Sequence, residues 1–517
     1  MKLKTSFLLM LALTLVFFRP APAQEKQTLN LSLEDCIAKA LKNNLNVAVE
    51  RMNPELADIS LSKARETFMP SFELSFGSNR QETPSYWWIQ GAGNSISKMS
   101  DYGLTIVETI PTGGSFSLSL QSYKSNTNQP FQLINPRYGS TLRFDFSQPL
   151  LRNFGPKIAR RQVHLAEMNL DISELQLRNT LIDTIYLVQQ AYWNYVYAVE
   201  NYEVKKQSLQ LGRDLLAKNR KEVEFGQLAP IEILTAESVV AQREADLIQA
   251  EGLITRSEEV LKSMINLAAE GDARLKKLVP SDKPEFKEAR VVLDEALKEA
   301  LERRPDLMIL KKSLETKALN LKVAKNQTLP SLDLQLSYWS PGISGDRLLY
   351  LDDNPFLGVI VGKEPGSPGN SLRDAFKLLY SNWNVGLTLS IPLSNFTSKA
   401  DYAYAKMDLS QSQVKLKNLE QQVELEVSDA VRANETNAKK VEAYRVARDL
   451  AEKSLDAEEK KLKVGLSTNY FVLEFQEKLA NARSMEVKAK IDYILSMASL
   501  ERAMGLSLAK RNIKVGE

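Results

Sequence analysis

Cysteine and histidine are almost absent from this 517-residue chain, which contains one of each, Cys36 and His164. A single cysteine excludes a disulfide framework, and one residue of each kind excludes both a Cys/His zinc site and a Cys–His nucleophile pair. Glycine-rich phosphate-binding signatures of the Rossmann and P-loop types are also missing, and the many carboxylates lie on charged helical faces. The sequence therefore predicts no enzyme, no metal site and no cofactor.

Apolar runs long enough for a transmembrane helix, about 18 residues, are also lacking. The N-terminus instead has Lys2 and Lys4 before an apolar run from Ser6 to Phe18, followed by the small residues of Ala21-Pro-Ala23. This order is typical of a secretory signal peptide, expected over residues 1–23, and predicts an exported protein. The net charge of +3, without a clustered basic face, predicts no nucleic-acid partner.

Proline and glycine are scarce over two long stretches. Residues 157–225 contain no proline and one glycine, Gly212, and residues 393–464 contain neither. Gly226 and Gly465 follow these stretches directly, and a second helical pattern follows each of them. A glycine in this position predicts the end of a helix. We therefore expect two long helical hairpins, over residues 156–266 and 396–505.

The second helix of each hairpin carries the pattern of a coiled-coil seam. Apolar residues recur every seven positions, with small residues such as Ala236 and Ala489 in the +3 positions. The apolar series consists of Ile233, Val240, Leu247, Ile254 and Leu261 in the first hairpin, and of Val472, Leu479, Tyr493 and Leu500 in the second. The small residues predict a close approach between helices.

The two halves of the chain match each other. At an offset of 260 residues Leu33 pairs with Leu293, and at an offset of 239 residues Gly226 pairs with Gly465. A period of this length predicts a domain duplication. The expected organisation is a first repeat over 24–267, a charged linker over 268–290, a second repeat over 291–506 and a short C-terminal tail over 507–517.

Within each repeat, apolar and polar residues alternate with the period of a half-buried strand. Strands are expected over about residues 71–148 and 331–391, with clear cases at Phe72–Phe76, Phe116–Leu120, Leu142–Phe146, Leu332–Tyr338 and Trp383–Ile391. A small exported β-sandwich and a membrane-spanning barrel both give this alternation. The barrel is favoured by aromatic residues at the expected strand ends, which would form an interfacial girdle: Trp87-Trp88, Tyr138, Tyr338-Trp339 and Trp383.

The expected strands are too few to close a barrel alone, because closure takes at least about eight. A barrel therefore requires an oligomer. Segment 102–124 either adds a barrel hairpin or forms an extracellular flap. We expect a short turn at Pro111–Gly114 and long external loops over Arg80–Asp101, Lys124–Arg137 and Ser340–Asn382.

Together these features resemble the outer-membrane efflux protein (TolC-like) family. The most specific marks are Leu31-Ser-Leu-Glu-Asp35, Pro70-Ser71, Pro330-Ser331 and Val464–Thr468. The resemblance implies a mixed α+β membrane protein, a homotrimer in which a long α-helical coiled-coil barrel joins a shared transmembrane β-barrel. It implies residence in the Gram-negative outer membrane, in contact with its lipid, with the helices projecting into the periplasm.

The same resemblance implies a function and its sites. The family forms passive exit ducts of tripartite efflux pumps or type I secretion systems, working with a periplasmic adaptor and an inner-membrane transporter of the RND or ABC type. The adaptor docks at the hairpin tips, which here are Phe225, Gly226, Gln227, Leu228, Val464, Gly465, Leu466, Ser467 and Thr468.

Some members of the family close the periplasmic aperture with acidic residues six and nine positions after the second tip glycine. This chain has Phe471 and Glu474 there, so only one of the two is acidic. An aromatic plug combined with a ring of Glu474 side chains is one interpretation. The other is that Glu474 is an ordinary solvated helix residue.

A periplasmic coiled-coil adaptor or scaffold without a pore is the competing hypothesis. An adaptor would carry one helical hairpin flanked by compact β-modules. Two hairpins, each preceded by apolar-faced strands, favour the duct. The sequence specifies neither the cargo nor the pump class.

Overall fold

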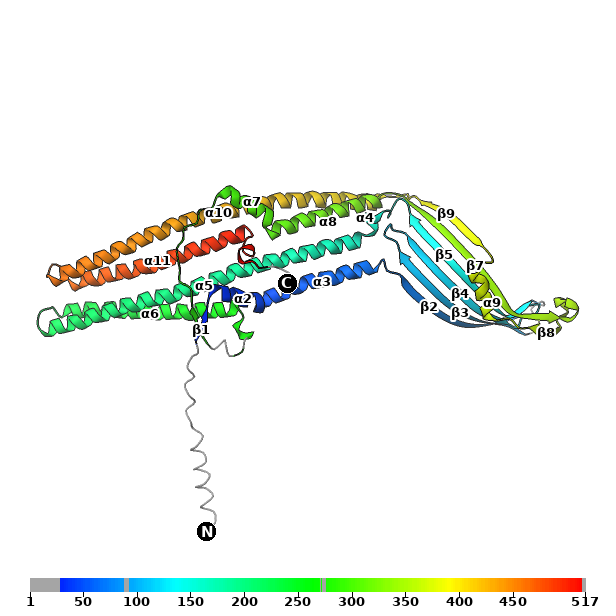
Figure 1. Cartoon of the computed structure of the whole chain (residues 1–517), viewed down its shortest axis with the longest axis horizontal. Helices are drawn as coiled ribbons and strands as arrows, with labels where there is room; N and C mark the ends of the chain where they lie inside the picture. The colour runs from blue at the N-terminus through cyan, green and yellow to red at the C-terminus, as the bar shows by residue number, and fades with distance from the viewer. Residues whose placement is uncertain (1–27, 88–92, 270, 272–275, 514–517) are drawn as a thin grey trace, which may run out of the picture. The chain divides into compact units, whose positions relative to one another are not determined.

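The structure, a computed structural model, describes residues 28–87, 93–269, 271 and 276–513. The expected signal peptide lies outside these residues. The chain divides into two compact units (Figure 1). Unit 1 comprises residues 1–53, 174–309 and 417–517, and unit 2 comprises residues 54–173 and 310–416.

The elements of the first half are, in chain order, β1 (Thr28–Leu31), α2 (Leu33–Asn43), α3 (Leu45–Glu66), β2 (Ser71–Pro84), β3 (Asn94–Thr109), β4 (Ser115–Thr127), β5 (Ile134–Pro149), α4 (Pro156–Ala159), α5 (Arg161–Glu224) and α6 (Ile231–Met264). Those of the second half are β6 (Lys277–Pro280), α7 (Leu293–Arg303), α8 (Pro305–Gln327), β7 (Ser331–Tyr350), β8 (Ile360–Glu364), α9 (Pro368–Phe376), β9 (Asn382–Ser390), α10 (Phe396–Lys463) and α11 (Asn469–Ala503), with short 3₁₀ turns after β7 and α11.

Among the described residues, no helix combines enough length with enough hydropathy to cross a membrane.

Unit 1 contains α6, α11 and most of α5 and α10, the helices of the two predicted hairpins, which lie side by side (Figure 1). A cluster of buried apolar residues joins them, with Leu215 and Ala236 from the first hairpin and Leu455, Val472 and Leu479 from the second. The predicted heptad positions are buried or half-buried along both second helices. The seam pattern is thereby confirmed.

The N-terminal helix of unit 1 begins as its sequence predicts. The Ser32 side chain accepts a hydrogen bond from the backbone N–H of Asp35, and the Asp35 carboxylate accepts one from the N–H of Ser32, which is a capping box. Cys36, on the first turn, is fully buried in the main apolar cluster, and this burial raises the pKa of its thiol to about 12. It is a small core residue, as expected.

The expected linker over residues 268–290 contains structure that the sequence did not predict. β6 lies within it and pairs in parallel with β1. The Tyr195 hydroxyl of α5 donates to the carbonyl oxygen of Leu278, and the Tyr192 hydroxyl donates to Asp282. A four-residue strand is too short to show an alternating pattern, so its tertiary partners are what define it.

Unit 2 contains an antiparallel sheet in which the long strands follow the order β2-β3-β4-β5-β7-β9, and the short β8 pairs with the far part of β7. Segment 102–124 belongs to β3 and β4, between β2 and β5, so it adds strands and is not a flap. The predicted turn at Pro111–Gly114 closes this hairpin: the N–H of Ile110 donates to the carbonyl oxygen of Gly114, and the N–H of Gly113 donates to that of Ile110.

The prediction of long loops was wrong over much of its length. β3 begins at Asn94, inside the expected loop Arg80–Asp101, and β7 continues from Ser340 to Tyr350. The rest of Ser340–Asn382 contains β8 and α9. The strands extend past the point where their apolar alternation fades, because backbone pairing with neighbours continues where both faces are polar.

Two of the aromatic positions that were expected at strand ends lie elsewhere. Tyr138 and Tyr338-Trp339 lie inside β5 and β7 and not at their ends, and Trp88 lies outside the described residues. Trp339 is also on the opposite face from Tyr338, with the Arg143 guanidinium 5.5 Å from its ring centre. The proposed girdle is therefore incomplete.

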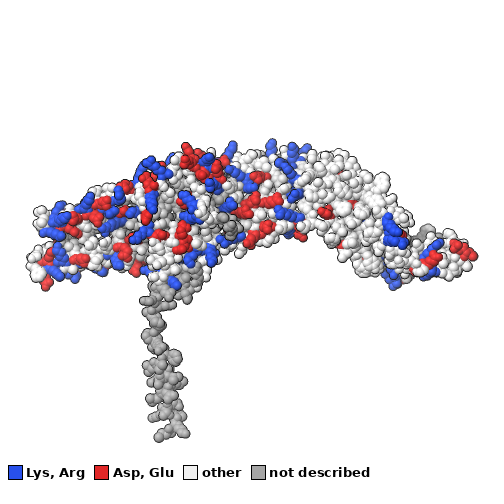
Figure 2. Space-filling model, viewed as in Figure 1, with Lys and Arg blue, Asp and Glu red and all other residues white. Residues whose placement is uncertain are grey.

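The two faces of the sheet differ strongly in polarity. Side chains alternate along each strand, and the pairing register aligns like with like across all six long strands. One face carries the apolar residues Phe72, Leu74, Leu104, Ile106, Leu118, Leu120, Leu142, Phe144, Leu334, Leu336, Val385 and Leu387. The other carries residues such as Ser117, Arg143, Asp145, Gln335 and Thr388. Figure 2 shows few charged side chains over the strands of this unit.

Candidate docking and aperture sites

Both hairpin tips are built by the same backbone turn. Gly226 and Gly465 have φ values of 70° and 77°, the left-handed region that glycine enters without a Cβ penalty. After α5, the N–H of Gly226 donates to the carbonyl oxygen of Val223 and the N–H of Gln227 to that of Glu222. This is a Schellman motif, and the same pair of bonds follows α10 at Gly465 and Leu466.

The expected docking residues are largely solvent-exposed. Phe225 is 76% exposed, Val464 70% and Leu466 78%, while Leu228 is half-buried. Contact between large apolar side chains and water is unfavourable, so the tips present a surface that a binding partner could cover.

The second tip is braced by a carboxylate, and the first is not. Glu458 is 8% exposed and accepts hydrogen bonds from the Ser467 hydroxyl, at 2.5 Å, and from Lys461 Nζ, at 2.9 Å. The Ser467 bond, followed by the Lys461 bond, lowers the pKa of Glu458. The position 239 residues earlier is Asn219, which is fully buried and does not titrate.

Phe471 and Glu474 lie near the second tip, three residues apart on one side of α11. Phe471 is 46% exposed and its ring meets that of Tyr470 edge-on. The Glu474 carboxylate is 2.6 Å from Lys478 Nζ, and both side chains are exposed. An exposed pair of this kind contributes little stability, roughly 0.3–0.5 kcal/mol for this spacing, so the charge of Glu474 remains available to other groups.

A buried arginine that the sequence did not reveal ties the hairpins together behind the tips. Arg243 of α6 is 6% exposed, and its guanidinium donates to the carbonyl oxygens of Ser208 and Leu473 and to the side chain of Gln476. Burial lowers the pKa of Arg243. A Cβ at Gly212 would lie 3.0 Å from Nη1 of this arginine, so the one glycine of α5 leaves room for it.

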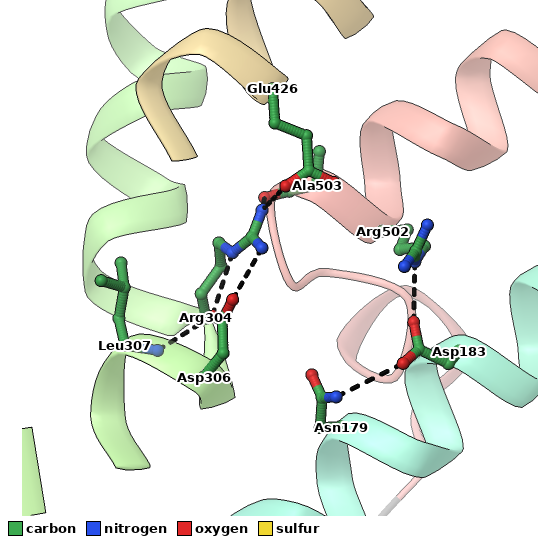
Figure 3. Close-up of polar contacts among 8 residues, drawn as sticks. All are labelled: Asn179, Asp183, Arg304, Asp306, Leu307, Glu426, Arg502 and Ala503. Carbon is green, nitrogen blue, oxygen red and sulfur yellow. Dashed lines mark hydrogen bonds and ion pairs between the residues drawn. The ribbon is translucent and has the colours of Figure 1, made fainter. Parts of the chain in front are cut away.

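A second unpredicted cluster surrounds the end of α11 (Figure 3). Arg304, between α7 and α8, donates through two nitrogens to Asp306, and through Nη1 to Glu426 at 2.6 Å and to the carbonyl oxygen of Ala503 at 3.1 Å. Burial would raise the pKa of Asp306, but the hydrogen bonds and charge of Arg304 outweigh it and lower that pKa.

Next to this cluster, Arg502 Nε lies 2.7 Å from the Asp183 carboxylate of α5, which also accepts a hydrogen bond from Asn179 (Figure 3). The last turn of α11 is therefore held from two sides. The sequence does contain a signal for the Arg304–Asp306 contact, since Arg304-Pro305-Asp306 places opposite charges on both sides of a proline that starts a helix.

No cluster of three or more His, Cys, Asp or Glu side chains suited to a metal ion occurs among residues 28–87, 93–269, 271 and 276–513.

Comparison with known proteins confirms the resemblance seen in the sequence. Residues 296–506 match the family described as outer membrane efflux protein. The chain is 26% identical over 370 residues to the outer membrane protein TolC of Vibrio cholerae, which covers 68% of this chain and 75% of that protein. It is 21% identical over 337 residues to the probable efflux pump outer membrane protein TtgC of Pseudomonas putida, covering 64% of this chain and 62% of that protein.

Solved structures share the fold along almost the whole chain. The outer membrane channel CmeC of Campylobacter jejuni aligns with a TM-score of 0.62 and 18% identity, over 93% of this chain and 88% of that one. The MtrE outer membrane channel of Neisseria gonorrhoeae aligns with a TM-score of 0.60 and 18% identity, over 92% and 88%. A membrane protein from Pseudomonas aeruginosa aligns with a TM-score of 0.64 and 16% identity, over 91% and 93%.

The brace at Glu458 makes the second tip sensitive to acid. Because the folded-state pKa is lowered, the stabilisation is present above the ordinary value of about 4.3 and is lost as the pH falls through the folded-state pKa. A spin label at Val464→Cys, in a Cys36→Ala background, should become more mobile as the pH falls below the ordinary pKa of a glutamate. A label at Phe225→Cys on the first tip, where Asn219 replaces the carboxylate, is the control. Equal responses at the two tips would contradict the brace.

Proposed function

We propose that this chain, a relative of the outer membrane efflux proteins, is the outer-membrane exit duct of an efflux assembly, conducting substrates passively from the periplasmic end to the exterior. The observation that carries the proposal is the sheet of unit 2, whose one face is apolar across six aligned strands while the other is polar. A soluble protein would have to cover that apolar face, whereas lipid covers it without further structure. This sheet also disfavours the adaptor hypothesis, in which the β-modules are compact and the helices form one hairpin.

The edges of the sheet support assembly into a homotrimer. β2 pairs only with β3 and β9 only with β7 among the described strands, so each leaves one edge without a backbone partner. Unpaired edges are not tolerated in lipid. β2 runs away from the helices and β9 runs back toward them, so β2 of one copy can pair in antiparallel fashion with β9 of the next. Three copies would contribute about eighteen long strands, a number at which a barrel encloses an aqueous channel.

We also propose the duplication and the repeat boundaries inferred from the sequence. α2 and α7 have 11 residues each and begin at Leu33 and Leu293, the expected offset. Each ends in an extended residue whose N–H bonds back to the helix, Asn44 to Ala40 and Arg304 to Ala300. β2 and β7 begin at Ser71 and Ser331, again at the same offset. These matched ends support a common ancestor for the two halves.

The inferred partners are a periplasmic adaptor at the hairpin tips and an inner-membrane transporter of the RND or ABC type. Exposed Phe225, Val464 and Leu466 provide apolar surface for the adaptor. We place the periplasmic aperture at Phe471 and Glu474. Passive conduction leaves the energy to the inner-membrane partner, and the location in the Gram-negative outer membrane, reached through a cleaved signal peptide, follows from the same proposal.

The membrane assignment predicts different effects of the same substitution at two neighbouring residues of β9. Leu387 lies on the apolar face and Thr388 on the polar face. Leu387→Arg should reduce the yield of detergent-extracted trimers, because an arginine on the lipid side costs about 2–4 kcal/mol at the bilayer midplane and less toward the boundaries. Thr388→Arg should assemble normally and change conductance in planar bilayers. Equal trimer yields from both variants would refute a lipid-facing sheet.

The docking assignment rests on the exposed second tip. Leu466→Glu should abolish resistance to a panel of toxic compounds in cells that depend on this chain, while trimers form at the normal level. The mutation removes apolar surface and adds a charge to be desolvated on docking. Leu450→Glu, at an exposed apolar position within α10, is the matched control and should retain resistance. Full resistance of the Leu466 variant would remove the tip from the docking site.

The aperture assignment concerns the charge of Glu474. Glu474→Lys should shift the single-channel permeability ratio toward anions, since a ring of carboxylates at a constriction favours cations. Asp456→Lys is the control, because Asp456 forms a comparable exposed pair with Lys460 on α10 and has no aperture assignment. An unchanged ratio in the Glu474 variant would mean that this residue is an ordinary solvated helix residue.

A further inference from the structure

A short helix lies on the sheet of unit 2 where no helix was predicted. α9 packs against β7 and β5 (Figure 1). Two of its residues face the sheet, Ser371, 1% exposed, and Ala375, fully buried. The Ser371 hydroxyl is 2.9 Å from that of Ser140 on β5.

Small residues of the strands allow this close contact. A Cβ at Gly342 of β7 would overlap the carbonyl oxygen of Ser371, so glycine is required there. Neighbouring Ser340 is fully buried, and Ser122 donates a hydrogen bond to Ser140. The sheet thus has a shallow bed of glycine and serine for α9.

The bed is on the apolar face of the sheet. Ser140 is in register with Leu142 and Phe144 along β5, and Gly342 with Ser340 and Tyr338 along β7, because alternate residues share a face. α9 is therefore on the side that lipid would cover in the proposed barrel.

The position along the strands corresponds to a membrane boundary. Gly342 is about eleven residues from the start of β7 at Ser331, and Ser140 about nine residues from the end of β5 at Pro149, the length of one tilted crossing of the hydrocarbon layer. A helix bound here would meet the headgroup layer at the end of the barrel away from the helices.

The outward surface of α9 is amphipathic. Phe376 is 57% exposed, and Leu379 and Tyr380, directly after the helix, are 59% and 56% exposed. Arg373 and Lys377 are exposed beside them, and Arg373 is 3.7 Å from Asp374. Aromatic and aliphatic side chains beside cations are the composition of a helix that lies in a membrane interface.

We propose that α9 and the residues to Tyr380 form an interfacial anchor that binds the outer leaflet. Phe376, Leu379 and Tyr380 contact the boundary of the acyl chains, and Arg373 and Lys377 bind lipid phosphate groups. The inference rests on the proposed function, because it takes the apolar face of the sheet as lipid-facing. It adds a specific lipid-binding site on the outer surface of the duct.

Depth-dependent quenching tests the anchor. A fluorophore is attached to Leu379→Cys in a Cys36→Ala background, and the full-length trimer is placed in vesicles of phosphatidylethanolamine and phosphatidylglycerol containing lipid quenchers at headgroup or mid-chain depth. The Leu379 label should be quenched chiefly from headgroup depth. A label at Leu387→Cys on β9, opposite Leu334 within the crossing, should be quenched more strongly from mid-chain depth than the Leu379 label is, and one at Phe225→Cys should be quenched by neither lipid.

The labels distinguish the two proposals. Quenching at Leu387 without quenching at Leu379 would overturn the anchor and leave the duct intact. No quenching at Leu387 would refute the lipid-facing sheet itself. Blue-shifted emission at Leu379 without quenching by either lipid would mean that protein covers α9, and would also overturn the anchor.

The cations provide an independent readout. In native mass spectrometry of the trimer, Arg373→Glu and Lys377→Glu should each reduce the retention of phosphatidylglycerol relative to phosphatidylcholine, by about fivefold for a residue at the lipid surface. Lys453→Glu, an exposed lysine of α10, is the control. Unchanged relative retention in both α9 variants would mean that these cations do not select anionic lipid, and would overturn their assignment to the lipid headgroups.

Discussion

The hydrogen-bonding requirement of the sheet backbone is the constraint on which the rest of this protein depends. Among the described strands of unit 2, the six long ones pair with their neighbours, but β2 and β9 each have one edge with no backbone partner for its N–H and C=O groups. Water could solvate those groups; hydrocarbon could not. Since the same strands carry a continuous apolar face, the chain needs partners at both edges as soon as that face enters lipid. In the proposed duct, oligomerisation and membrane insertion are therefore linked by one requirement.

Much of the fold could be predicted from the sequence, and the successful predictions depended on local rules. Gly226 and Gly465 end helices because only glycine enters the left-handed region without strain, and this signal is independent of the rest of the fold. The capping box at Ser32 and the heptad seams are equally local. Alternation predicted strands in both repeats but left their number open, and only pairing decided that segment 102–124 belongs to the sheet.

The missed features depend on residues distant in sequence. Arg243 is one of many arginines on charged helices, and its burial against Gln476 and the Leu473 carbonyl requires the second hairpin, more than 200 residues later. Gly212 acquires its role only through that arginine. α9 has a weak helical pattern among glycine and proline residues, and the Gly342 and Ser140 bed that holds it is visible only once β5 and β7 are paired. At the candidate aperture, sequence located Phe471 and Glu474 but not the Lys478 that accompanies them.

The parity of the strand count has an evolutionary consequence. Because each repeat contributes an even number of antiparallel long strands, the chain enters and leaves the sheet at the same end. This holds for any number of inserted hairpins. A β3–β4 unit can therefore be gained or lost as a module. In the proposed duct, this would widen or narrow the shared barrel and leave the helical hairpins unchanged. Under that proposal, the width of the pore and the fit to a pump partner would evolve independently of each other.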